Sequence, residues 1–298
     1  MRASNLLRRV LTAAILFELV CFCGCNKAKI SAVQNKNDVI YTWDLDEKPF
    51  SKDIFSPQIE SLPPENAAVW GGTVSHHLLA NEQIDRWFYE ISKRRKVKNF
   101  FIICPSHYGL STQTWSLANC KWKTKRGLVE TNLSIERKMA EKLGVSFEPQ
   151  VFPIEHGVNV LIPYISRYFP DAKICAVAVH GEPPLNQFEA QKLADVISPY
   201  FSDSGKKENF LLISTDFAHH GNFEETLLKD TRSRQFFNEP SAASWIFCGC
   251  DNRPGIYVLS RFLTKDTKNA VLYHTNSFEL SGQDGNDITS YFFSLFYD

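Results

Sequence analysis

A single-domain α/β fold, with a mostly parallel central sheet flanked by helices, is the architecture that this sequence predicts. From residue 67 onward, short apolar runs alternate with amphipathic stretches, as they do where strands and helices alternate along a chain. An apolar fraction of 44% over 298 residues is enough for a large core. Neither an internal repeat nor a linker follows residue 40, so we expect one domain over residues 41–298.

The first expected elements are a strand, a helix and a second strand. Residues 68–74 form an apolar run with a glycine pair, and residues 97–104 form another that is closed by Pro105. Between them, residues 78–93 place apolar side chains on one face of a helix.

A basic hairpin and two helices are expected next. Lysines alternate with Trp122 over residues 115–129, which predicts a hairpin with the lysines on a solvated face and Trp122 on the other. Residues 133–143 are predicted to be helical and end at Gly144, a residue favoured just after helix C-termini. A further helix is predicted over residues 158–168.

The C-terminal half continues the alternation. A strand is predicted over residues 173–179, an amphipathic helix over 185–201 and a strand over 209–214. The last expected elements are a helix over 254–263, a strand over 270–274 and an aromatic strand over 290–296. Polar residues are densest where the strand 209–214 ends.

The charges balance. The chain has 33 lysines and arginines and 33 aspartates and glutamates. Because no net field attracts a polyanion, we do not expect nucleic acid as a partner.

The N-terminus has the pattern of a bacterial export signal. Arg2, Arg8 and Arg9 precede an apolar run over residues 10–20 that is short for a membrane span, and the run ends near Cys25 in a segment that resembles a lipobox. We therefore expect a lipoprotein signal peptide over residues 1–25, a flexible tether over 26–40 and a lipid anchor at Cys25. This predicts an extracytoplasmic, membrane-anchored lipoprotein.

The cysteines that follow the anchor do not form a disulfide pattern. Their number is odd and their spacing is irregular: Cys104, Cys120, Cys175, Cys248 and Cys250. Cys104 and Cys175 lie in strand-like runs, where a free cysteine acts as a small buried hydrophobe.

Most of the histidines fall just after predicted strands. His76 and His77 follow the first strand, His107 follows the second, and His219 and His220 follow the strand 209–214. In a parallel sheet the carboxyl ends of the strands form one edge, where ligands bind. Although a single histidine is more often a hydrogen-bonded loop or core residue, several at one edge predict a shared site.

Imidazole, carboxylate and thiolate are the ligands that first-row transition metals accept. The candidates are His76, His107, Asp216, His219 and a cysteine or aspartate from residues 248–251. No Gly-x-Ser-x-Gly elbow is present, which argues against a serine hydrolase.

Four segments resemble, in order, the motifs of the Memo family, the group called AmmeMemoRadiSam system protein B. They are Gly71-Gly72-Thr73-Val74-Ser75-His76-His77-Leu78-Leu79-Ala80, Pro105-Ser106-His107-Tyr108-Gly109, Glu155-His156-Gly157-Val158 with Leu161-Ile162-Pro163-Tyr164, and Ser214-Thr215-Asp216-Phe217-Ala218-His219-His220-Gly221. The resemblance extends from about residue 68 to the C-terminus. Ser75 departs from the pattern, because the family usually has proline there.

The resemblance implies a class III extradiol dioxygenase (LigB)-like fold and a cleft that binds iron or copper through two histidines and a cysteine. Carried over by position, the metal ligands would be His76, His107 and Cys250, with Cys248 and then Asp251 as alternatives to Cys250. Four further residues would line the cleft: Glu155, His156, Asp216 and His219. Of these, His219 would act as general acid or base, and Asp216 could instead orient it.

Two functions remain open at this stage. One is a metal-dependent enzyme, with Fe(II) or copper, that performs redox or O2-linked chemistry on a small molecule. For this reading the family name suggests radical SAM and AMME-type partner proteins in a shared pathway. The other is a non-catalytic module that binds a metal, a peptide or a phosphorylated ligand.

Overall fold

The computed structural model describes residues 39–42, 58–181, 187–282 and 285–298, which all fall in one compact unit, Lys36–Asp298. The predicted signal peptide, the anchor at Cys25 and most of the predicted tether lie outside the described residues. Residues 39 and 40, the last of that tether, belong to strand β1 (Val39–Tyr41). Within the described residues, no helix is both long and apolar enough to cross a membrane.

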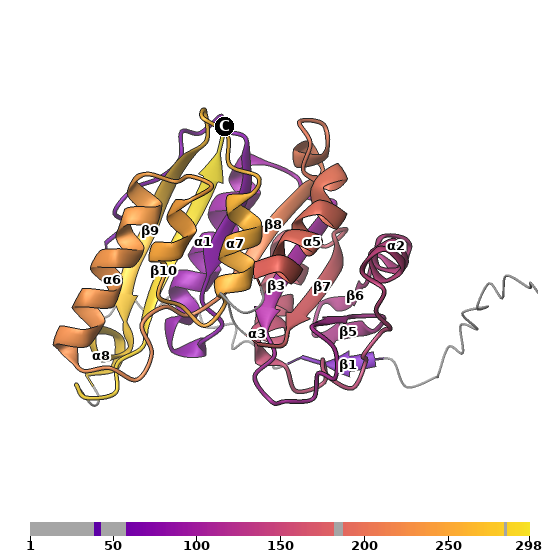
Figure 1. The fold of residues 1–298 in the computed structure, drawn as a ribbon, viewed down its shortest axis with the longest axis horizontal. Coiled ribbons are helices and arrows are strands. Elements are labelled where there is room, and N and C mark those ends of the chain that lie inside the picture. Colours follow the sequence, from indigo (N-terminus) through magenta and orange to yellow (C-terminus); the bar gives the residue numbers. More distant parts are fainter. Residues whose placement is uncertain (1–38, 43–57, 182–186, 283–284) are drawn as a thin grey trace, which may run out of the picture. The chain divides into compact units, whose positions relative to one another are not determined.

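In the described part of the chain, the strands form a sheet of seven and a sheet of three. The large sheet consists, in spatial order, of β4 (Trp115–Leu117), β7 (Lys173–Val179), β3 (Asn99–Pro105), β8 (Asn209–Ser214), β2 (Val69–Val74), β10 (Ser290–Tyr297) and β9 (Lys268–Asn276) (Figure 1). The strands β7, β3, β8 and β2 were all expected, and the bounds of β7 and β8 match the prediction.

The large sheet is mixed, which corrects the prediction of a mostly parallel sheet. The four central strands, β7, β3, β8 and β2, are parallel to one another. In contrast, β4 is antiparallel to β7, β10 is antiparallel to β2, and β9 is antiparallel to β10. Because β9 and β10 are joined only by a short segment that contains α8 (Ser277–Ser281), the chain makes no crossover there and the two strands run in opposite directions.

The small sheet has the order β1–β5–β6, with β5 (Lys121–Thr124) and β6 (Gly127–Glu130). These two strands are the expected hairpin, whereas β4, which was predicted as part of it, joins the large sheet instead. Trp122 is fully buried and its indole N–H donates to Asn159, while Lys121 pairs with Glu130 at the surface. The solvated face predicted for the lysines is therefore confirmed.

Two apolar layers cover the two faces of the large sheet, because successive strand residues point to opposite sides. Phe100 and Ile102 of β3 pack with helices of one face, and Phe101 and Ile103 pack with those of the other. The first face carries α1 (Asn81–Arg94), α3 (His156–Asn159) and α4 (Ile162–Tyr168). The second carries α2 (Leu133–Leu143), α5 (Gln187–Ile197), α6 (Phe223–Asn238) and α7 (Arg253–Ser260). Figure 1 shows α5, α6 and α7 over the same face.

The helix ends follow local chemistry. Gly144 follows α2 in the left-handed conformation, as expected. The helix predicted over 158–168 is divided into α3 and α4, and the helix predicted from residue 78 begins with a 3-10 turn, η1 (Leu78–Ala80). Helix α6 was not predicted, although Asn222 and Glu225 form a capping box at its start.

Candidate metal centre

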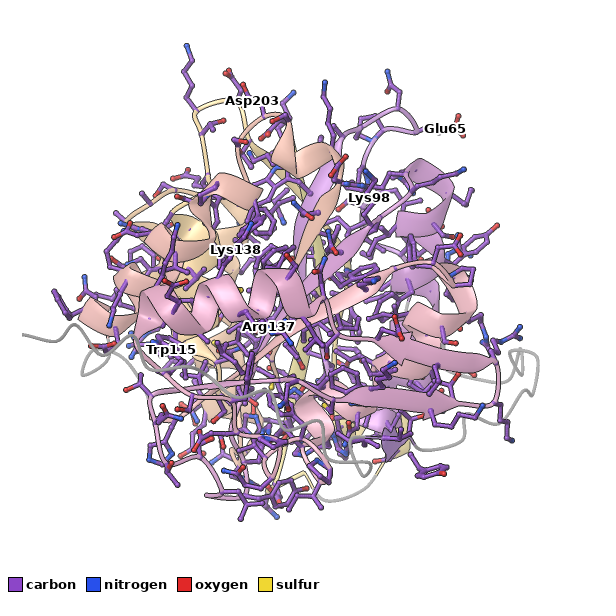
Figure 2. All side chains as sticks on the ribbon, turned by 90° about the vertical axis from the view of Figure 1, so that its right-hand side faces the viewer. Glu65, Lys98, Trp115, Arg137, Lys138 and Asp203 are labelled. Carbon is purple, nitrogen blue, oxygen red and sulfur yellow. The ribbon has the colours of Figure 1, made fainter. Side chains whose placement is uncertain are left out.

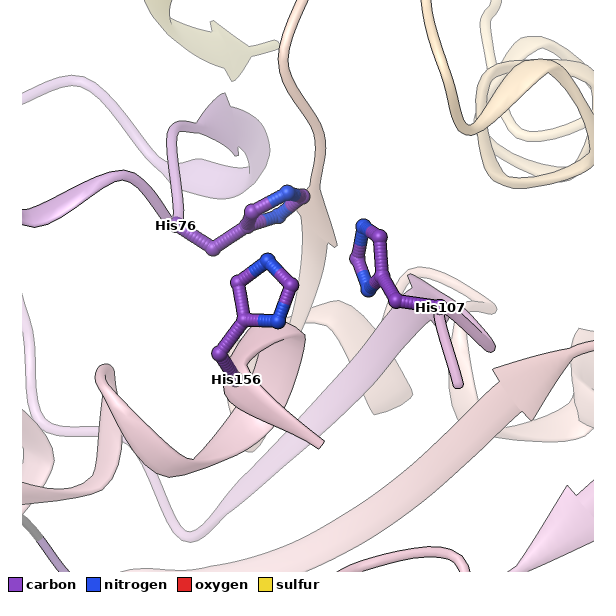
Figure 3. A group of neighbouring side chains, drawn as sticks. All are labelled: His76, His107 and His156. Atoms are coloured by element: carbon purple, nitrogen blue, oxygen red, sulfur yellow. The ribbon is translucent and has the colours of Figure 1, made fainter. Parts of the chain in front are cut away.

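Three imidazole rings converge at the carboxyl edge of the parallel strands. His76 follows β2, His107 follows β3, and His156 is the first residue of α3. One ring nitrogen from each lies within 4.8 Å of the others, and Figure 3 shows the three rings turned toward a common space. Because β2 and β3 are both parallel to β8, their ends bring His76 and His107 together, as the sequence predicted.

A carboxylate lies among these rings. Oδ2 of Asp251 is 3.2 Å from Nε2 of His76, 3.7 Å from Nε2 of His107 and 3.5 Å from Nε2 of His219. This oxygen and Nε2 of His219 are both buried, and within the described part of the chain neither atom has a hydrogen-bond partner. Two buried polar atoms without a hydrogen-bond partner among the described residues therefore lie 3.5 Å apart at the centre of the cluster.

The other oxygen of Asp251 is fixed by two donors. Oδ1 accepts from the hydroxyl of Thr215, at 2.7 Å, and from the backbone N–H of Asp216, at 3.1 Å. The backbone N–H of Asp251 in turn donates to the carbonyl of Asp216. The segment after β8 therefore orients Oδ2 toward the histidines.

Hydrogen bonds on the far side of the rings orient His76 and His107. Ser214 donates its hydroxyl hydrogen to the carbonyl of Gly157 at 2.6 Å, so it can only accept from Nδ1 of His76, which is 3.0 Å away. Oε1 of Glu155 accepts from Nδ1 of His107 at 2.7 Å. Both rings therefore hold a hydrogen on Nδ1 and direct Nε2 toward Asp251, which is how a carboxylate or hydroxyl prepares a histidine for metal binding.

Glu155 is held in place by the backbone. Its carboxylate also accepts from the N–H groups of His107 and Gly157, each at 2.9 Å. The second of these bonds caps α3, so one buried residue both begins the helix that carries His156 and orients His107.

Asp216 lies beside the same cluster. Its Oδ2 is 3.7 Å from Nε2 of His76, and its Oδ1 accepts from the hydroxyl of Ser75 at 2.6 Å. Ser75 is fully buried and also accepts from the N–H of His77. The serine that stands in place of the expected proline therefore fixes both the loop before His76 and the carboxylate of Asp216.

The charges of the cluster follow from these neighbours. Burial lowers the pKa of His76, but Asp216 and Asp251 outweigh it and the net pKa is raised. Burial likewise opposes the charge on His107, whereas the carboxylates of Asp251 and Glu155 raise its pKa to about 9. Burial, together with the positive charge of the two other rings, lowers the pKa of His156 to about 4. At neutral pH the ring of His107 is therefore cationic and the ring of His156 is neutral in the metal-free centre.

Comparison with known proteins identifies the family of this chain. The family model for Memo-like proteins matches residues 79–239. The chain belongs to the Memo family. It is 25% identical over 186 residues to a MEMO1 family protein of Pyrobaculum aerophilum and 27% identical over 182 residues to one of Pyrobaculum arsenaticum, in each case over 60% of this chain. A MEMO1 family protein of Sulfurisphaera tokodaii is 22% identical over 243 residues, which cover 77% of this chain and 80% of that protein. The chain spans 63% of the length of the two Pyrobaculum proteins.

Cys250 does not join the converging donors of this Memo-family chain, as far as the described residues show. Together with Cys248 it lines a separate cavity beside α6. Burial raises the pKa of Cys250 to about 12, so its thiol is neutral in the metal-free protein. Oδ2 of Asp251, the third choice from the sequence, lies beside His76 and His107. The choice of third ligand among Cys250, Cys248 and Asp251 stays a prediction.

The remaining histidines of the motifs differ in their surroundings. The side chain of His219 is 35% exposed and borders the centre through Asp251. His220, in contrast, pairs with Asp287 at the surface, and His77 hydrogen-bonds to Tyr291. Within the last motif, sequence reasoning did not single out the positioning roles of Ser214 and Thr215, although both belong to the segment it quoted.

Proposed function

We propose that this Memo-family chain binds a divalent transition metal, Fe(II) or copper, through His76, His107 and Asp251. The observation that carries the proposal is the buried oxygen of Asp251, which faces Nε2 of both histidines and has no hydrogen-bond partner among the residues that the structure describes. His156 supplies a further nitrogen within reach of the same space.

The residues fit such an ion in spacing and in type. Two ligand atoms that are each about 2.1 Å from a common ion are about 3.0–3.4 Å apart at angles of about 90–110°. The distances from Asp251 to His76 and His107, 3.2 and 3.7 Å, are close to this range. Two histidines with one carboxylate and open positions are the donor set of non-haem Fe(II) oxygenases. A bound metal would supply redox or O2-linked chemistry on a small organic substrate.

The protein's own groups supply proton control and orientation. Nε2 of His219 lies 3.5 Å from Asp251 and has no hydrogen-bond partner among the described residues, and the ring is partly exposed, so His219 is placed to act as general acid or base. Glu155 and Ser214 keep hydrogens on the outer nitrogens of His107 and His76. Asp216, fixed by Ser75, adds negative charge beside His76.

Other parts of the proposal come from the resemblance. They are a relationship to the class III extradiol dioxygenase fold, a place in a pathway with radical SAM and AMME-type proteins, and a lipid anchor at Cys25 outside the cytoplasm. The mixed sheet with four parallel central strands is compatible with the first.

The test compares the two candidate third ligands. Protein is loaded with Fe(II) without oxygen, desalted, and analysed for bound metal and for affinity by chelator competition. We expect Asp251→Asn to weaken metal binding by more than about 100-fold. Glu155→Gln should weaken it by about 10–100-fold, which is the loss typical of a residue that orients a ligand without touching the metal. His220→Ala, in a surface histidine, is the control.

Equal affinity in Asp251→Asn and wild type would remove Asp251 from the site. A large loss in Cys250→Ser would restore the cysteine predicted from the sequence.

A binding module without turnover is the second candidate. It is favoured by the cationic ring of His107 in the metal-free centre, which suits an acidic peptide or a phosphorylated ligand. O2 consumption by iron-loaded protein in the presence of candidate reductants and substrates separates the two functions. Stoichiometric metal with no O2 consumption would favour the module.

A further inference from the structure

A second cavity lies beside the metal centre, between α6 and the segment that precedes α7. Its volume is about 580 Å³, which is in the range of small-molecule sites. The residues that line it are Lys229, Arg232, Gln235, Ile246, Phe247, Cys248, Gly249, Cys250 and Arg253. None of them belongs to the cluster of histidines and carboxylates described above.

The charge of this cavity is one-sided. Three cationic side chains line it, from Lys229, Arg232 and Arg253, and no acidic residue does. This is unusual in a chain whose formal charges sum to zero. Among the described residues, no carboxylate forms an ion pair with Lys229 or Arg232, so their charges are available to a ligand. The guanidinium of Arg253 lies over the ring of Trp245, 5.4 Å from its centre, which holds it at the cavity wall.

Apolar surface adjoins these charges. Ile246 and Phe247 are 59% and 44% exposed, although both belong to the short helix η4 (Ser244–Phe247) that packs on α6. Gly249 leaves room in the wall, since a methyl group there would come no closer than 3.7 Å to Lys229. A ligand that fits must carry a negative charge at one end and an apolar group at the other.

We propose that this cavity is a binding site for a small organic anion, a carboxylate or phosphate joined to an apolar group. Arginine forks match both kinds of anion through paired hydrogen bonds, and Ile246 with Phe247 would cover the apolar group. The site does not depend on the metal proposal. It adjoins the metal centre, because Lys229 donates to the carbonyl of His219 at 3.2 Å and Cys250 directly precedes Asp251.

Calorimetric titration of chelator-treated protein tests the proposal, because removal of metal excludes binding of the anions to an ion. The probes are phenylacetate, phenyl phosphate, inorganic phosphate and the neutral 2-phenylethanol. We expect phenylacetate or phenyl phosphate to bind more tightly than the last two, and the tighter of them identifies the charged group. Binding should weaken with added salt. Equal binding of 2-phenylethanol, or the absence of binding by both organic anions, would overturn the proposal.

Variants locate the binding. Arg232→Gln should weaken binding of the organic anion by about tenfold, the value of one charge-assisted hydrogen bond. Arg137→Gln is the matched control, because Arg137 is an exposed arginine on α2 (Figure 2) and should leave binding unchanged. Phe247→Ala should reduce the preference for phenyl phosphate over inorganic phosphate. Wild-type affinity in Arg232→Gln would place the anion elsewhere, for example at the cationic ring of His107, and would refute this site.

Discussion

Replacement of Asp251 by asparagine keeps the shape of the side chain and removes its negative charge, so it measures what holds His107 in its cationic form. Oδ2 of Asp251 lies 3.7 Å from Nε2 of His107. For unit charges at this distance, Coulomb's law gives about 1 kcal/mol in water and about 4.5 kcal/mol at an effective dielectric constant of about 20. Since one pH unit corresponds to about 1.4 kcal/mol, the pKa of His107, raised to about 9 in the native chain, should fall by about one to three pH units.

NMR titration of the histidine ring protons in chelator-treated protein is the assay. The control is Asp287→Asn, because Asp287 lies 2.7 Å from Nδ1 of His220 in a pair that is exposed on both sides. Solvent screens that pair, so the loss of its charge should leave the titration midpoint of His107 unchanged. If Asp251→Asn leaves the midpoint of His107 where it is in wild type, Asp251 does not control the charge of this ring and our account of the centre fails.

Five further predictions can be checked independently. Burial raises the pKa of Glu136, so the contribution of this side chain to stability is present below its ordinary pKa and is lost as the pH rises. Glu136→Gln should therefore add about 1–3 kcal/mol to the free energy of unfolding at about pH 8 and little at about pH 4. An equal gain at both pH values would contradict this. Metal affinity should rise with pH up to about 9, because His107 must lose a proton to bind, and chelator competition that shows a flat profile would refute it. Without metal, the contribution of His107 to stability should be lost as the pH rises through about 9, which urea unfolding can follow. A methyl group at Gly72 would clash with the backbone of β10, so Gly72→Ala should destabilise by about 1–3 kcal/mol in urea unfolding, whereas Gly249→Ala, where a methyl group has room, should not. Cys25→Ser should abolish metabolic labelling with palmitate, and unchanged labelling would exclude the lipid anchor.

The parallel core was predictable because its strands are continuous apolar runs. Residues 174–179 and 209–214 are buried on both faces and are bounded by polar residues, so their ends were clear. Strand direction was not predictable, since the residues of β10 would suit either direction. Helix α6 was missed for a different reason: Leu227 and Leu228 are exposed, so its apolar residues do not mark one face.

The side chains of the candidate centre that follow strand ends were predictable from the sequence. The side chain that comes from a loop was not, because the path of the loop decides where it points. The prediction that His76 and His107 meet is confirmed, while their role as ligands stays a prediction. The third ligand was ambiguous because Cys250 and Asp251 are adjacent in a loop without periodicity. The bonds from Thr215 and Asp216 decide that the carboxylate faces the rings, and a single sequence does not reveal such contacts between distant segments.

The donors of this centre come from positions far apart along the chain, at 76, 107, 156 and 251. No nascent fragment that ends before residue 251 contains them all, so high-affinity binding can arise only after almost the whole domain has been synthesised and its long-range strand pairs have formed. Metal uptake would then occur only in chains that have completed folding. Each tenfold excess of free metal over its dissociation constant would add about 1.4 kcal/mol to the free energy of unfolding of the completed domain and nothing to that of a shorter fragment.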